Sequence, residues 1–250
     1  MMSWKKKFPV LQALAAVLLI AAFFVVAGIL LQHNWQWTRL PDYGKKFAFG
    51  FGVTVMISFF SLILSLIIGT LAAAGKRSEF LFVKYTATFY IELIRGTPLL
   101  VQTIFFFYFI GTAYNLNNRY LMGILILSTF SGAYVSEIIR AGLESIPSAQ
   151  MESAKSLCFT RLQTYRYIIV PQVSRVVLPP LTGQFASLIK DSSILSLIAV
   201  NEFTKNVQEV DSITFTPFEN YILLAVGYLV LTIPISLLTR RLERKMAYAN

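Results

Sequence analysis

The stretch AFGFGVTVMISFFSLILSLIIGTLAAAG, residues Ala48–Gly75, is 28 residues long and contains no charged side chain. A helix that crosses the hydrocarbon core of a bilayer needs about 20 mostly apolar residues. A lipid environment offers no hydrogen-bond partners to the backbone, so a single run of this kind satisfies its own peptide groups by forming a helix. The stretch therefore predicts a helical membrane protein.

Five further stretches predict additional spans. They are Phe8–Leu31, Leu99–Tyr114, Leu121–Ile139, Val176–Val200 and Tyr221–Leu238. Leu99–Tyr114 is short and needs residues from the segment before it. Composition agrees, because only 14% of the residues are charged, against about 25% in soluble domains. The predicted fold class is all-α and integral to the membrane, with six transmembrane helices.

The basic residues predict the orientation. The connecting segments on one side hold 16 Lys and Arg residues, those on the other side hold 5, and Lys190 falls inside a span. Because cytoplasmic loops carry the excess of Lys and Arg, both termini are expected in the cytoplasm. A secretory signal peptide is the alternative for the first span. Its apolar run of roughly 24 residues exceeds the usual h-region and no small-x-small site follows, which favours an uncleaved helix.

Cysteine and histidine content excludes several kinds of site. Cys158 and His33 are the only residues of their types, so a Cys/His zinc site or a Cys–His catalytic pair cannot be built. No G-x-x-x-x-G-K-[ST] motif occurs, so the chain lacks a P-loop of its own. The prediction is a non-enzymatic chain without a cofactor, whose energy comes from another subunit or from an ion gradient.

The polar stretch Arg140–Gln172 is too long for a simple turn and contains two short helical patterns. Pro147 suits the first turn of one helix, with Ser145 or Ser148 as its cap. Thr160 and the Gln three residues later have the spacing of a capping box for the second. Two interpretations remain open, which are a helical hairpin on the bilayer surface and a docking element for a cytoplasmic partner.

The sequence EIIRAGLESIPSAQMESAKSLCFTRLQTYRYIIVPQ, Glu137–Gln172, resembles the EAA loop of ABC-importer permease subunits. In that family the loop forms a coupling helix that sits in a groove of the ATP-binding subunit. The resemblance implies this contact for Ser145, Pro147, Gln150, Glu152, Ala154, Leu157 and Cys158. Ala149 and Cys158 depart from the family pattern, which usually has Gly there. If Cys158 must adopt a left-handed backbone conformation, its side chain makes this cost about 1 kcal/mol or more.

Two more motifs resemble the polar amino-acid uptake branch of these permeases. They are ELIRGTPLLVQ, Glu92–Gln102, and ASLIKDSSILSLI, Ala186–Ile198. The resemblance implies a five-helix type I permease core in residues 47–245 with its coupling loop at 140–172, preceded by an extra helix and linker (1–46) and followed by a short tail (246–250). It also implies four kinds of partner: ATPase subunits that bind ATP and Mg²⁺, an extracytoplasmic solute-binding protein, membrane lipid, and a second permease subunit. No nucleic acid is implied.

Lys190 and Asp191 form the first part of a candidate substrate path. A charge within a membrane span costs roughly 2.5–3.5 kcal/mol on insertion scales, so such residues are usually functional. Together they offer partners for the carboxylate and the ammonium group of an amino acid. Ser192 and Ser193 are expected to bond either a ligand or a freed backbone. The alternative is a structural ion pair or a helix break.

Glu92 and Arg95 form the second part. With Lys84 and Thr88 they recur at helical spacing and give an otherwise apolar helix one polar stripe. The stripe predicts either residues beside the translocation path or an interfacial helix in which Glu92 and Arg95 form an i, i+3 pair.

A self-sufficient secondary transporter, coupled to an ion through Lys190 and Asp191, is the alternative function. Such folds usually contain internal repeats of membrane segments, and none is visible here. The motifs therefore predict an ATP-driven importer permease. Neither the amino acid carried nor the choice between an identical and a paralogous second permease follows from the sequence.

Overall fold

The computed structural model describes residues 18–19, 22, 25–26, 28 and 33–247. Most of the predicted first span, Phe8–Leu31, and the end of the tail, 248–250, lie outside the described residues. The chain separates into two compact units, Met1–Arg39 and Leu40–Asn250. In the first unit, Trp35 stacks on Trp37 with 5.8 Å between their ring centroids.

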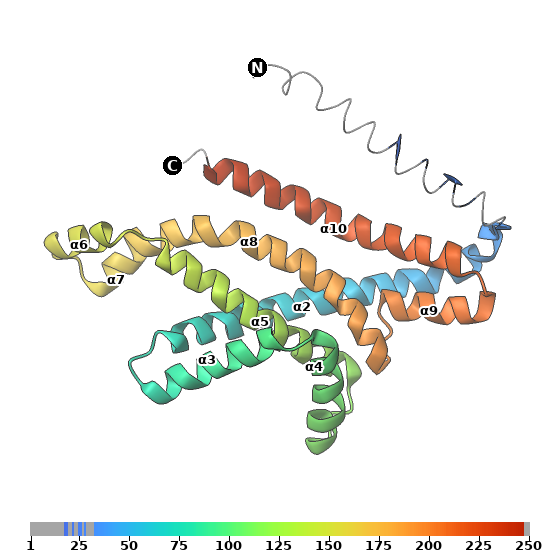
Figure 1. The fold of residues 1–250 in the computed structure, drawn as a ribbon, viewed down its shortest axis with the longest axis horizontal. Coiled ribbons are helices and arrows are strands. Elements are labelled where there is room, and N and C mark those ends of the chain that lie inside the picture. The colour runs from blue at the N-terminus through green and yellow to red at the C-terminus, as the bar shows by residue number, and fades with distance from the viewer. Residues whose placement is uncertain (1–17, 20–21, 23–24, 27, 29–32, 248–250) are drawn as a thin grey trace, which may run out of the picture. The chain divides into compact units, whose positions relative to one another are not determined.

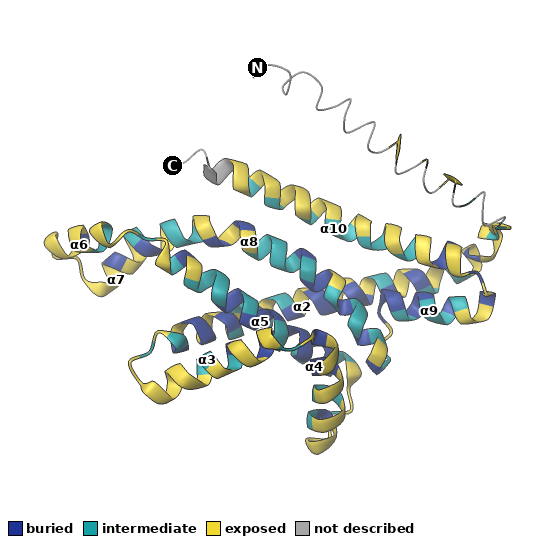
Figure 2. Ribbon diagram, in the orientation of Figure 1, coloured by how far each residue is buried: buried dark blue, intermediate teal, exposed yellow. Residues whose placement is uncertain are grey.

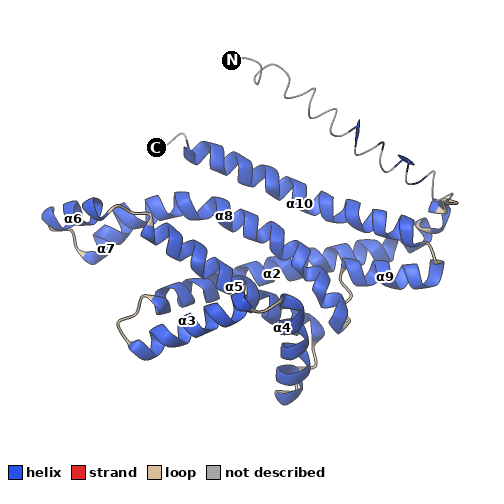
Figure 3. Ribbon diagram, in the orientation of Figure 1, coloured by secondary structure: helices blue, strands red, loops and turns tan. Residues whose placement is uncertain are grey.

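All regular structure of the second unit is helical in the described residues (Figure 3). The helices are α2 (Gly44–Lys76), α3 (Leu81–Gly96), α4 (Leu99–Phe105), α5 (Arg119–Glu144), α6 (Ser148–Ser156), α7 (Arg161–Thr164), α8 (Val170–Asp191), α9 (Phe203–Thr214) and α10 (Pro217–Ala247). A π-helical segment, Phe106–Gly111, extends α4, and another, Tyr165–Ile169, joins α7 to α8. The prediction of an all-α fold is confirmed for this part of the chain.

Three segments of the described chain are long and apolar enough to cross a membrane. They are Trp37–Lys76, Arg119–Glu144 and Pro217–Arg244. The predicted short span becomes part of a bent pair, Leu81–Gly96 and Leu99–Gly111, whose axes meet at 112°. The predicted span Val176–Val200 corresponds to α8 and the 3₁₀-helix after it, which do not meet the same standard. The structure thus supports three or four spans by composition, and the count of six stays a prediction.

Gln102 stabilises the bend between α3 and α4. Thr97 and Pro98 have extended backbones, which ends α3 and starts α4 in a new direction. The side-chain amide of Gln102 donates to the carbonyl of Ile94 at 2.7 Å and to the hydroxyl of Thr97 at 2.8 Å. One buried side chain therefore satisfies acceptors that the end of α3 leaves open.

Small residues bring α2 against α5. Ser61 and Ser65 are fully buried, and a Cβ added to Gly69 would lie 2.5 Å from Val135 Cγ1. The helices approach so closely because these side chains are small, as their four-residue spacing indicates. The hydroxyl of Ser61 donates to the carbonyl of Ile124 at 3.4 Å.

The directions of the helices bring the C-terminal ends of three of them to the same end of the bundle. α8 runs antiparallel to α5, because Gln184 bonds Ser131 while the more N-terminal Val177 packs on Gly142. α10 returns along α8 and reaches it through Thr239 and Thr182, 2.8 Å apart. The C-terminal ends of α2, α5 and α10 therefore lie at the end of the bundle that carries α6 and α7 (Figure 1). We call this the loop end.

The opposite end is held by a buried carboxylate. Glu202 is fully buried and caps α9 by accepting hydrogen bonds from the backbone N–H groups of Thr204 and Lys205, at 2.9 and 2.7 Å. The hydroxyls of Thr54 on α2 and Tyr228 on α10 donate to the same carboxylate. Figure 2 shows the buried faces of α2 and α9 in this region. Glu202 thus links three helices.

Replacing Glu202 by alanine leaves buried donors without an acceptor and removes a helix cap. We expect Glu202→Ala to lower the free energy of unfolding by about 1–3 kcal/mol, measured by thermal or denaturant unfolding of the purified chain. Glu209→Ala is the matched control on the same helix, because the Glu209 side chain is 37% exposed and forms ion pairs only at the surface. Equal losses for the two variants would contradict a structural role of the buried carboxylate.

Candidate functional site: the coupling loop and the end of α8

The segment between α5 and α8 extends away from the other helices, with α6 at its tip (Figure 1). Most of its residues are exposed (Figure 2). Glu152 is exposed and Leu157 is 69% exposed, whereas Ala154, the buried residue of α6, is only 1% exposed. The segment therefore presents one helix whose exposed Ser153 and Ser156 bond only its own backbone, and whose Glu152 forms no ion pair in the described chain.

The start of α6 differs in detail from the prediction. The helix begins at Ser148, after Pro147, and no side chain caps it. Ser145 instead ends α5, where its hydroxyl donates to the carbonyl of Gly142 at 2.7 Å. The predicted serine cap is wrong because Ser145 still has a helical backbone and bonds its own helix. Gln150 accepts a hydrogen bond from Gln172, which ties α6 to α8.

The turn after α6 has the geometry that the family pattern led us to expect. Cys158 is exposed and has a φ of 54°, in the left-handed region. The N–H of Phe159 bonds the carbonyl of Ala154, and that of Cys158 bonds the carbonyl of Lys155, as in a Schellman motif. Glycine usually occupies this position because it has no Cβ. The predicted capping box of Thr160 and Gln163 is also confirmed, with bonds of 3.3 and 2.8 Å.

A cluster of charges lies where the loop leaves α5. Glu137 pairs with Lys76 of α2 at 2.9 Å, with Arg140 at 2.8 Å and with Arg95 of α3 at 3.6 Å. Arg140 also pairs with Glu144. No pattern in the sequence links Glu137 to Lys76 or Arg95. The available signal was a basic residue near the C-terminal end of α2 and another near that of α3, but only the fold brings these residues to Glu137.

The candidate path residues of α8 lie where the regular helix ends. Asp191 is the last residue of α8, and a 3₁₀-helix, Ser192–Ile198, follows it. Lys190 is exposed, Asp191 is half-buried, and no ion pair joins them among the described residues. The hydroxyls of Ser192 and Ser193 donate to carbonyls one turn back, at 2.8 and 2.7 Å. Of the alternatives that the sequence left open, the structure shows a break in the regular helix after Asp191 and hydrogen bonds from Ser192 and Ser193 to the backbone.

The structure places the two halves of the candidate path at different levels. Gln184 bonds Ser131 and Leu195 lies beside Gly123, so Asp191 is level with the N-terminal half of α5, between these two contacts. Arg95 instead lies over the ring of Tyr134, at 5.6 Å, and pairs with Glu137.

The alternative pairing of Arg95 with Glu92 is not observed, because Arg95 reaches Glu137. Glu92 is exposed and has no ion pair in the described chain. Arg95 thus belongs to the charge cluster at the loop end rather than to the site around Asp191.

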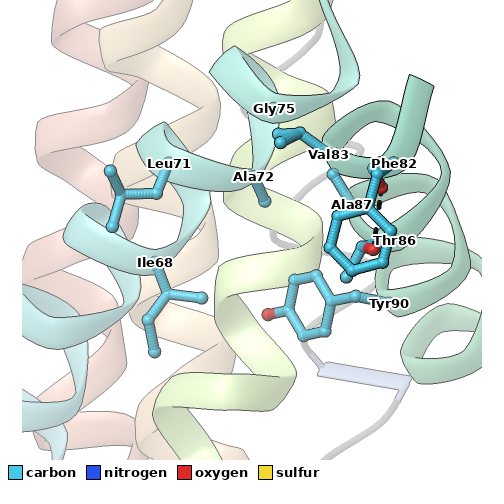
Figure 4. Close-up of a pocket in the computed structure, with 9 residues that line it drawn as sticks. All are labelled: Ile68, Leu71, Ala72, Gly75, Phe82, Val83, Thr86, Ala87 and Tyr90. Carbon is cyan, nitrogen blue, oxygen red and sulfur yellow. Dashed lines mark hydrogen bonds between the residues drawn. The ribbon is translucent and has the colours of Figure 1, made fainter. Parts of the chain in front are cut away.

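A groove between α2 and α3 has a different chemistry (Figure 4). Its volume is about 400 Å³, and apolar side chains such as Ile68, Phe82 and Val83 line it. The hydroxyl of Tyr90 is already bonded to the carbonyl of Thr129 at 2.6 Å. The groove therefore offers no charged partner to a zwitterion. The described residues also contain no group of three or more side chains suited to a metal ion.

The family model of the binding-protein-dependent transport system inner membrane component matches residues 65–248. The chain belongs to this family. The resemblance to ABC-importer permeases, carried by the three motifs, is thereby confirmed, and the ion-coupled secondary transporter is not favoured. The match includes the segment 140–172 and the end of α8.

Relatives and solved structures agree with this family. The chain is 36% identical to the probable glutamine ABC transporter permease protein GlnM of Bacillus subtilis over 79% of this chain and 91% of that protein. It is 34% identical to the glutamine transport system permease protein GlnP of Escherichia coli K12 over 86% of this chain and 99% of that protein.

A crystal structure of "an amino acid ABC transporter with histidines" matches with a TM-score of 0.78 and 34% identity. The match covers 85% of this chain and 100% of that one. The MetNI methionine ABC transporter in an inward-facing conformation matches with a TM-score of 0.67 at 14% identity, which shows a shared fold. The match covers 82% of this chain and 98% of that one.

The left-handed turn gives a direct prediction. Cys158→Gly removes the Cβ that strains this conformation, and we expect it to stabilise the folded chain by about 1 kcal/mol. Thermal unfolding of the purified chain measures the change. Ser156→Gly is the control, because Ser156 is the last residue of α6 and glycine there costs helix stability. A Cys158→Gly variant that is less stable than the parent would contradict the strain.

Proposed function

We propose that the chain is the permease subunit of an ATP-driven importer for a polar amino acid and that α6 is its coupling helix. The observation that supports this most strongly is the extended loop between α5 and α8, whose exposed helix falls within the family match. The partners proposed for it are two ATP-binding subunits, which bind ATP and Mg²⁺. A solute-binding protein and a second permease subunit, identical or paralogous, complete the assembly.

The charge cluster supports a mechanical role for the loop. Glu137 is bonded to α2, α3 and α5, so a force applied to α6 reaches three helices through one anchored point. Closure of the ATP-binding subunits would then move the bundle rather than the loop alone. Both termini lie in the cytoplasm in this proposal, and the membrane is the inner membrane of a bacterial-type cell.

The site around Asp191 is the proposed point of contact with the transported amino acid. Lys190 would bind the carboxylate and Asp191 the ammonium group, with Ser192 and Ser193 holding the helix end in place. The relatives include glutamine permeases, which favours a substrate with a neutral polar side chain. Such a side chain has no charge with which a third charged residue could pair. We do not include Arg95 and Glu92 in this contact, because Arg95 pairs with Glu137 in the charge cluster at the loop end.

Reversing a charge on the outer face of α6 tests the coupling role. We expect Glu152→Arg to lower transport-coupled ATP hydrolysis of the complex in proteoliposomes about ten-fold, because the variant places an unpaired charge in the interface. Glu243→Arg is the matched control, with the same change at an exposed position near the end of α10. Equal activity of the Glu152 variant, the control and the parent would contradict the assignment of α6.

Neutral variants at the end of α8 test the substrate contact. We expect Lys190→Met and Asp191→Asn to raise the KM for uptake about ten-fold or more, while hydrolysis of ATP without substrate stays unchanged. Lys205→Met on α9 is the control, because Lys205 pairs with Glu209 at the surface. Unchanged uptake in both Lys190 and Asp191 variants would remove them from the path and leave the coupling role standing.

A further inference from the structure

Three basic side chains converge on a cavity beside the coupling helix. Arg77 follows the end of α2, Lys155 lies on α6 and Arg161 begins α7. The cavity has a volume of about 340 Å³, at the lower end of the range of about 300–1,000 Å³ that is typical of small-molecule sites. It lies entirely within the second unit of the chain.

These cations have no counter-charge in the described chain. No ion pair includes Arg77, Lys155 or Arg161, whereas Lys76, the neighbour of Arg77, pairs with Glu137. Among the described residues that line the cavity there is no carboxylate. A basic excess at a cytoplasmic membrane edge is expected from the positive-inside rule alone. This rule does not explain why basic residues from three separate segments line one cavity that has no acidic residue in its described lining.

The geometry points to a phosphate-bearing anion as the ligand of this cavity, held by Arg77, Lys155 and Arg161. Guanidinium groups match phosphate oxygens with two parallel hydrogen bonds, and a Lys ammonium adds a third donor group. The bound anion would join the end of α2 to α6 and so brace the coupling helix.

The surroundings of the cavity favour the headgroup of an anionic phospholipid over a soluble phosphate. Tyr165 lines the cavity and is 53% exposed, and Leu162 next to Arg161 is 76% exposed. A short segment with exposed apolar and aromatic side chains beside Arg residues is typical of the membrane interface. Basic pockets on the cytoplasmic side of membrane proteins bind anionic headgroups.

Native mass spectrometry of the full chain in detergent tests the proposal, with phosphatidylglycerol and phosphatidylcholine as probes. We expect phosphatidylglycerol to be retained in preference and expect Arg77→Gln with Arg161→Gln to weaken its binding about ten-fold. Lys155→Gln alone should weaken it less. The matched control is Arg166→Gln with Arg175→Gln, which removes two nearby charges that do not line the cavity and should leave binding unchanged.

Inorganic phosphate separates the two sources of the ligand. Cys158 is the only cysteine, is exposed and precedes Phe159 of the cavity wall, so a fluorophore on it reports occupancy. A response to millimolar phosphate that the cavity variant loses, without retention of phosphatidylglycerol, would support the site with a soluble ligand.

Three outcomes would overturn the proposal. The first is that neither probe binds the parent chain. The second is an equal loss of binding in the cavity variant and the control, which would indicate a diffuse attraction of charges. The third is unchanged lipid and phosphate binding in a cavity variant that no longer associates with the ATP-binding subunit. In that case the cavity takes an acidic side chain of the partner protein. Thermal unfolding of each variant excludes a loss of fold.

Discussion

The carboxylate of Glu137 forms ion pairs with side chains from three helices. These are Lys76 of α2, Arg95 of α3 and Arg140 of its own helix, α5. Its side chain is only 16% exposed, so removing these partners would leave a charge with little water around it. This constraint fixes the point at which the loop leaves the bundle. Because α5 also packs along α2 and α8, the whole loop end is positioned relative to this one residue.

Two carboxylates link the helices of the bundle, one near each end. Glu137 acts at the loop end with charged partners, whereas Glu202 at the other end is fully buried and has hydrogen-bond donors instead. Between them, α2 and α5 touch through Ser61, Ser65 and Gly69. The helix α8 loses its regular form at Asp191, which is level with the N-terminal half of α5. The arrangement links the helices at both ends of the bundle and places the irregular backbone at the candidate substrate contact.

The sequence predicts those features that depend on neighbouring residues. The apolar run at Ala48–Gly75 and the capping box at Thr160 are both local patterns, and the structure confirms them. The partners of Glu137 come from positions 61 and 42 residues away, and no periodicity links them. The 112° bend after α3 was missed for a similar reason, because Gln102 fixes it through a contact that forms only after the turn is made.

We propose that this chain works only with a separate ATP-binding subunit seated on α6. Gentle purification of the chain from its native membrane, with mass spectrometry of what accompanies it, tests this most directly. We expect a stoichiometric ATP-binding subunit and, after reconstitution in liposomes, uptake that requires ATP. A chain that purifies alone and accumulates substrate in response to an imposed ion gradient would contradict it.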